Sequence, residues 1–132
     1  MRAEATVQNN IPVKFLDLSN AARTAVIRKA HRQGGNVVLR RARTMAPVDT
    51  GNLKRSLQNR VRVRSRKATG SAHIIARQPR GAHAYLVELG TVHMAAQPFL
   101  RPALDQSRSP VEQEFEKALR EEIDKRIERA GL

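Results

Sequence analysis

The chain has no cysteine and no tryptophan, and only one tyrosine and three phenylalanines among its 132 residues. The absence of cysteine excludes disulfides and thiolate metal sites, and it is typical of a chain that folds in a reducing compartment. With so few aromatic side chains, we expect an aliphatic core in which Phe15, Tyr85, Phe99 and Phe115 are the few large members. The length is that of one domain with a single modest core.

Long hydrophobic runs are also missing. No apolar stretch reaches the roughly 20 residues that a membrane-spanning helix requires. Residues 1–15 include Glu4 and Pro12 and lack the apolar segment of a signal peptide. We therefore expect a chain that is made in the cytoplasm and has no membrane partner.

Acidic residues are scarce in the first 80 positions. Residues 1–80 contain 18 Lys and Arg but three acidic residues, a net charge of +15, whereas residues 81–132 contain seven and nine, a net charge of −2. Such asymmetry predicts a basic face that contacts a polyanion or an acidic partner. An alternative is that the basic residues only keep the chain soluble.

The spacings of catalytic and metal sites are absent as well. Asp49-Thr50-Gly51 occurs once, whereas an aspartic protease needs two carboxylates that share a proton. Asp49 and Thr50 are therefore interpreted as caps at a helix start. Glu88 has no second carboxylate to complete a glycosidase pair, and no metal-ligand spacing joins His31, His73, His83 and His93. The sequence predicts a protein that is not an enzyme and that binds no cofactor or metal.

A long helix is expected to start after residues 17–19 and to run to about Met45. Asp17 or Ser19 can cap it, and Pro47 forces it to stop by about Met45. Gly34 and Gly35 predict either a kink or a closely approaching neighbour in its middle. Apolar or small residues recur at steps of three and four, namely Ile27, Ala30, Gly34, Val38, Ala42 and Met45.

The remaining elements complete an α+β domain. Strict alternation predicts a strand over residues 58–66, and a hairpin returns over 72–78. A short element is expected over 84–89, with Gly90 as its stop. Ser109 with Glu112 forms a capping-box pattern that predicts the start of a C-terminal helix ending near Arg129. The expected fold is a small antiparallel, hairpin-based sheet packed against the long N-terminal helix and the C-terminal helix.

We expect two parts in the chain. Residues 17–132 form the single domain, and residues 1–16 form a flexible N-terminal arm that orders against a neighbour. The docking points expected on the arm are Ile11, Val13, Phe15 and Leu16.

Three polar, glycine- or proline-bearing blocks carry a family resemblance. They read P-V-D-T-G-x-L-x-x-S over residues 47–56, Y-L-V-E-L-G-T over 85–91 and P-F-L-R-P-A-L over 98–104. In this order they are similar to the tail-completion, or neck, proteins of long-tailed bacteriophages, including the lambda-like tail-completion protein. The resemblance implies a structural virion protein at the head–tail junction, assembled in the host cytoplasm. It further implies a closed ring, expected to be a hexamer, between the head connector (adaptor or stopper) and the tail terminator or tail tube.

The second and third blocks hold the residues that we expect at an assembly interface. Phe99 has an alternative role as a core residue, since other aromatic side chains are few. Glu88 and Arg101 are expected as a charge pair. The full set is Tyr85, Glu88, Gly90, Thr91, Phe99, Leu100 and Arg101.

A stripe of arginines alternates with valines along the predicted strand, at Arg60, Arg62, Arg64 and Arg66. These side chains can meet DNA phosphates in a lumen, or prevent aggregation at a sheet edge. They can also pair with Glu114, Glu121 or Glu122 of a neighbouring copy. Solvated or partner-facing roles are favoured, because tight phosphate contacts would hinder DNA that must slide. The competing interpretation of the whole chain is a sequence-independent nucleic-acid-binding protein, with a pI of about 11.6 in its favour and few aromatics for base stacking against it.

Overall fold

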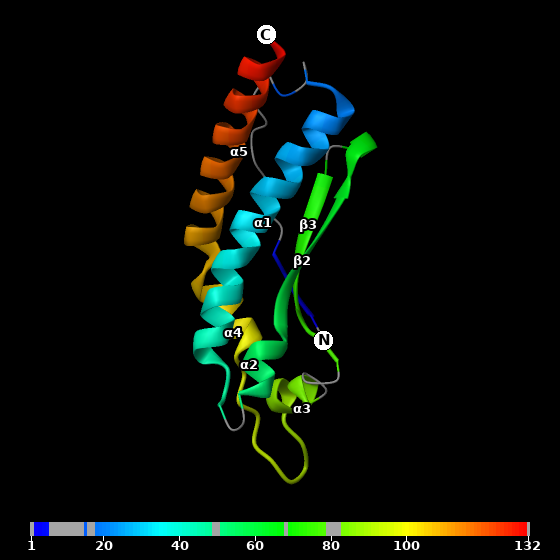
Figure 1. The fold of residues 1–132 in the computed structure, drawn as a ribbon. Coiled ribbons are helices and arrows are strands. Elements are labelled where there is room, and N and C mark those ends of the chain that lie inside the picture. Colours follow the sequence, from blue (N-terminus) through cyan, green and yellow to red (C-terminus); the bar gives the residue numbers. More distant parts are fainter. Residues whose placement is uncertain are drawn as a thin grey trace.

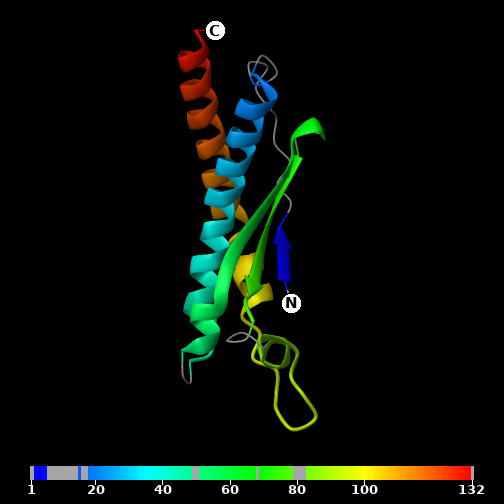
Figure 2. The same ribbon diagram turned by 45° about the vertical axis from the view of Figure 1, so that its right-hand side comes forward.

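The computed structural model describes residues 2–5, 15, 18–48, 51–67, 69–78 and 83–131. The helices and strands are, in chain order, β1 (Arg2–Ala5), α1 (Asn20–Met45), α2 (Asn52–Ser56), β2 (Leu57–Arg64), the 3-10 turn η2 (Ser65–Lys67), β3 (Thr69–Ala76), α3 (Ala84–Leu89), α4 (Leu100–Gln106) and α5 (Arg108–Ala130). α1 lies between most of α5 and a three-stranded antiparallel sheet (Figures 1 and 2). The predicted α+β class, with its long N-terminal helix, small sheet and C-terminal helix, is confirmed.

The long helix α1 begins and ends where its local sequence predicts. Ser19 is the N-cap, and its Oγ accepts a hydrogen bond of 3.2 Å from the backbone N–H of Ala22. At the other end Ala46 is already extended, with φ −63° and ψ 132°, because the residue before Pro47 is excluded from the helical region. Both boundaries are therefore set by residues within one turn of them.

Gly35 allows a neighbour to approach an unbroken helix closely, whereas the neighbours of Gly34 lie at an ordinary packing distance. A Cβ on Gly34 would lie 3.5 Å from Cβ of Phe115 on α5, and one on Gly35 would lie 2.5 Å from Nδ2 of Asn59 on β2. The same Nδ2 donates to the backbone carbonyl of Arg32 at 3.1 Å. Of the two alternatives, the structure has the close approach, and the approaching atoms belong to side chains.

The sheet has the strand order β1-β3-β2, with β3 in the centre. β2 and β3 form the predicted hairpin, in which Leu57 pairs with Ala76 and Arg64 with Thr69. The first strand ends earlier than predicted, because residues 65–67 turn into η2 and take Arg66 out of the strand. The second strand begins earlier than predicted, at Thr69.

The third strand, β1, was not predicted. Residues 2–5 pair antiparallel with residues 72–75 of β3, within the segment for which we expected a flexible arm. Phe15, one of the expected docking points, is fully buried in the core between α1 and α5. The other three, Ile11, Val13 and Leu16, lie outside the described residues.

Helix α5 begins two residues before the position that the capping-box pattern predicted. Its N-cap is the buried Ser107, which also ends α4, and the N–H of Val111 donates to the Ser107 carbonyl at 2.8 Å. Ser109 is consequently inside the first turn, and the predicted capping box is wrong. The burial of Ser107 at the junction of two helices decides the boundary.

His31 on α1 is a half-buried titratable side chain. Its ring packs edge-on against Phe115 at a centroid distance of 4.8 Å, and Nδ1 donates to the Ile27 carbonyl at 2.9 Å. Burial lowers the pKa of His31 below its ordinary value of 6.5, although backbone hydrogen bonds at Ile27 and Gly70 oppose the shift.

We expect the free energy of unfolding to be constant above this ordinary pKa and to fall as the pH drops below it. The unfolded chain takes up a proton at a pH at which the folded chain does not. Urea titrations at about pH 7.5 and about pH 5.5 measure the difference, since the two values bracket the ordinary pKa of histidine. His31→Gln should reduce this difference in the free energy of unfolding, and His93→Gln, the control at an exposed site, should leave it unchanged. An equal pH dependence in the wild type and both variants would contradict this account.

Candidate interaction surfaces

The carboxylate of Glu88 on α3 caps α4. Oε2 accepts hydrogen bonds from the backbone N–H groups of Phe99 (2.7 Å) and Leu100 (3.0 Å), and Oε1 accepts one from that of Arg101 (3.0 Å). The first N–H groups of a helix have no acceptor within it, and a negative charge at that end is favourable. Glu88 is only 7% exposed, so the cap lies inside the protein. It connects α3 to the start of α4, since Glu88 and its donors are 11 to 13 residues apart in the sequence.

The structure places several predicted interface residues differently from the prediction. Glu88 contacts the backbone of Arg101, and the structure gives no ion pair between the two side chains. Phe99 and Leu100 are buried in the core beneath the sheet, which for Phe99 is the alternative role that the sequence left open. Tyr85, Thr91 and Arg101 are exposed and remain interface candidates by proposal.

A defined turn follows α3. Gly90 has φ +76°, and a Cβ there would lie 2.7 Å from the backbone nitrogen of Ala96, so glycine is required. The N–H of Thr91 donates to the Met94 carbonyl at 2.8 Å, and the N–H of Gln97 donates to the Val87 carbonyl at 2.8 Å. Residues 91–97 therefore fold back against α3.

Large exposed apolar side chains of the described residues gather at this end of the molecule. They lie on α3, on the following turn and at the end of the α1–α2 connection, remote from the C-terminus (Figure 1). The only acidic or basic residue in 83–98, other than histidine, is the buried Glu88. We call this surface the apolar tip; its members, 40–98% exposed, are Val48, Tyr85, Leu86, Leu89, Val92 and Met94. Exposed apolar side chains that gather at one end of a molecule indicate an interaction site.

The apolar tip also contains a hollow of about 550 Å³. It lies between the α1–α2 connection, α3 and the turn after α3. The described residues that line it are Pro47, Val48, Gly51, Leu53, His83, Val87, Met94 and Gln97, and none of these is acidic, lysine or arginine.

A second surface is strongly cationic. Arg60, Arg62 and Arg64 are exposed on one face of β2, with Val61 and Val63 half-buried on the other, while Arg66 is exposed in η2. Residues 18–80 contain 16 Lys and Arg and one acidic residue, Asp49. The ion pairs shown between described residues lie on α4 and α5, so within that part of the chain no acidic side chain pairs with the arginines of β2.

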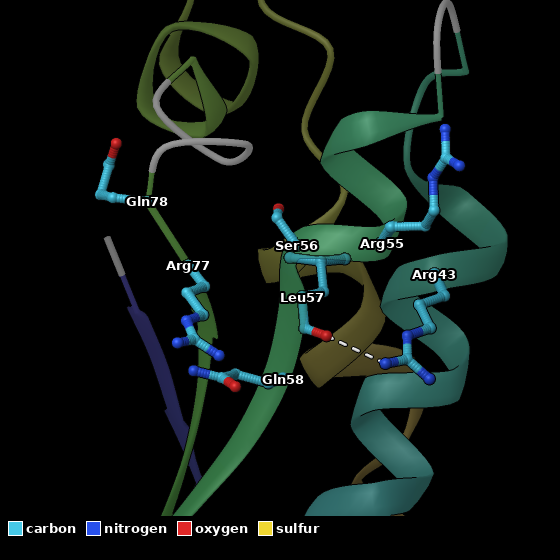
Figure 3. A pocket seen from close by; sticks show the side chains of 7 residues that line it. All are labelled: Arg43, Arg55, Ser56, Leu57, Gln58, Arg77 and Gln78. Carbon is cyan, nitrogen blue, oxygen red and sulfur yellow. Dashed lines mark hydrogen bonds between the residues drawn. The ribbon is translucent and has the colours of Figure 1, made fainter.

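The cationic surface continues into a hollow of about 460 Å³ at the start of β2 (Figure 3). Arg43 donates from Nη2 to the Leu57 carbonyl at 3.0 Å, and Arg77 lies on the other side of that residue, beside Gln58. Because these guanidinium groups flank the strand rather than meet at one point, the hollow extends the basic surface and does not form a pocket around a single small anion. Its other lining residues are Arg55, Ser56 and Gln78.

Two further features bear on function. Among the described residues, no three His, Asp or Glu side chains lie close enough together to hold a metal ion. No helix in that part of the chain is both long and apolar enough to cross a membrane.

Asp49 and Thr50, the expected helix caps, lie outside the described residues, and the N-cap position of α2 falls on Gly51 with φ +81°.

Comparison with known proteins gave one family. The model of the family described as "HK97-gp10_like: Bacteriophage HK97-gp10, putative tail-component" matches residues 13–90, more than half of the chain. Neither a search of curated proteins nor a search of solved structures found a match. The matched range includes the first polar block and most of the second, up to Gly90, and not the block at 98–104.

Proposed function

Because the chain belongs to the HK97-gp10-like family of bacteriophage tail components, we propose that it completes the neck of a tailed phage or phage-derived particle. In this role it joins the head connector, adaptor or stopper, to the tail terminator or tail tube proteins. Copies form a closed ring, a hexamer, around the path of the DNA. Membership of the family confirms the predicted relation to a phage tail component, a structural virion protein.

The apolar tip is the observation that carries this proposal. A protein whose work is joining needs surfaces that lose water when a partner arrives. The described surface is otherwise rich in charge, yet residues 83–98 expose no acidic, lysine or arginine side chain. The cap from Glu88 and the backbone hydrogen bonds of the turn hold this surface in shape before any partner binds.

Deleting the gene from the phage or prophage that encodes the chain tests the proposal. We expect filled heads and complete tails that remain separate, and joined particles when the chain is supplied from a plasmid. Electron microscopy counts the three classes. Joined particles at wild-type frequency in the deletion would contradict a role in the neck.

The cationic surface favours a second candidate, a sequence-independent nucleic-acid-binding protein. A duplex binder that contacts Z phosphates loses affinity with a slope of about −0.9Z in a plot of log K against log salt. For a neck protein we expect duplex binding no tighter than about 10⁻⁶ M at physiological salt. Fluorescence anisotropy with a DNA duplex measures this affinity. The proteins compared are the wild type and the triple variant Arg60→Ser, Arg62→Ser, Arg64→Ser. Nanomolar binding that the variant loses would favour the nucleic-acid binder.

A further inference from the structure

The apolar tip holds two complementary features side by side. Val92 is 98% exposed in the turn that follows α3, so it protrudes from the tip. The hollow of about 550 Å³ opens at the same end and includes Val48 and Leu53 in its lining. The described residues of the two features include no acidic, lysine or arginine side chain.

We propose that the turn at residues 91–94 of one copy inserts Val92 into the hollow of the next copy in the ring. The occupant of the hollow is thus a second copy of this chain, and the contact is heterologous, protrusion to hollow. The inference rests on the proposed ring and names the surfaces that close it.

Symmetry favours this pairing. Copies in a cyclic ring share one orientation relative to the axis, so a protrusion can meet only a surface at its own level along that axis. Val92 and the hollow lie at the same end of the molecule, so in a ring whose axis runs along the length of the chain they lie at the same level in neighbouring copies. A heterologous contact of this kind generates a closed ring when its rotation closes.

The net charge of the chain also favours a contact through the apolar tip. At a net charge of +13 the copies repel one another, and the exposed arginines of β2 add to that repulsion wherever two such faces meet. Among the described residues, the exposed apolar side chains of the tip and the lining of the hollow include no lysine or arginine, so they add no such repulsion when two copies meet there. Such a contact removes apolar surface from water, which is favourable in proportion to the area buried.

The dimensions and the rigidity of the turn also agree with insertion. A volume of about 550 Å³ lies within the range of about 300–1,000 Å³ that is usual for binding pockets, so one valine and its neighbours fit. Thr91 and Met94 exchange two backbone hydrogen bonds, of 2.8 and 3.3 Å, which fix the turn that presents Val92. A preformed turn loses little conformational entropy on insertion.

Disulfide cross-linking tests the contact without interference, because the chain has no cysteine of its own. The test variant carries Val48→Cys and Val92→Cys, and both sites are exposed in the free chain. The matched control carries Val92→Cys and Arg129→Cys, which places the second thiol near the far end of α5. Both are oxidised as purified chain and as assembled particles, and are separated by denaturing electrophoresis without reductant. A disulfide forms only when the two Cα atoms come within about 7 Å.

We expect a reductant-sensitive ladder from the test variant in at least one preparation, with a largest band equal to the number of copies in the ring, and no ladder from the control. The absence of a ladder in both preparations overturns the contact, as does an equal ladder from the control. If particles carry the chain at the junction and neither preparation gives a ladder, the contact fails while the proposed function stands. If the purified chain gives the ladder but particles lack the chain, the contact stands and the neck role fails.

Discussion

Glu88→Ala is expected to lower the free energy of unfolding by about 2–4 kcal/mol. The substitution removes the acceptor of three backbone N–H groups, those of Phe99, Leu100 and Arg101, of which the first two are buried. A buried donor without an acceptor costs about 1–3 kcal/mol, and entry of water offsets part of the sum. Urea unfolding followed by circular dichroism measures the change.

Two variants control for this result. Glu121→Ala removes an exposed carboxylate from α5 and should change stability by less than about 0.5 kcal/mol. Glu88→Gln keeps one oxygen acceptor but presents an amide N–H₂ group to the remaining donors, so its loss should be intermediate. Glu88→Ala with the stability of the wild type would contradict the capping role.

The second large effect is expected from Val92→Asp, which should reduce the yield of joined particles by about 100-fold or more. An unpaired carboxylate buried in a contact costs several kcal/mol, and each 1.4 kcal/mol corresponds to a tenfold change in affinity. The same contact occurs between every two neighbouring copies, so the substitution weakens every interface of the ring. Plaque titre and electron microscopy of a complemented deletion measure it.

The isolated chain should fold as the wild type does, because Val92 is almost fully exposed. Gln113→Asp is the matched control: it adds the same charge at an exposed position on α5 and should leave the yield unchanged. A wild-type yield from Val92→Asp would exclude the tip from assembly. An unfolded Val92→Asp chain would contradict the exposed position of this residue.

The sequence predicts the elements whose signals are local. The start of α1 depends on Ser19 and its end on Pro47, each within one turn of the boundary. The element over 84–89 and its stop at Gly90 agree with α3, since positive φ at that glycine is a local requirement. β1 is different, because its partner lies about 70 residues away in β3 and its four residues alternate charged side chains with alanine, a residue that is depleted in strands.

The candidate surfaces were only partly predictable. The alternation of valine with arginine indicates an exposed basic face, and only Arg66 leaves the strand. Glu88 seemed a lone acid because its partners are backbone N–H groups, which have no side-chain signature in a sequence. The apolar tip has a signal in the sequence, because between Arg80 and Arg101 the chain has no charged residue except Glu88.

The most direct test of the central claim is electron microscopy of intact particles in which this chain carries a gold-binding tag at its C-terminus. The C-terminus lies at the end of the molecule opposite the apolar tip, so the tag leaves the proposed contact free (Figure 1). The account predicts a ring of label at the junction of head and tail. Label elsewhere on the particle, or particles without the chain, would contradict it.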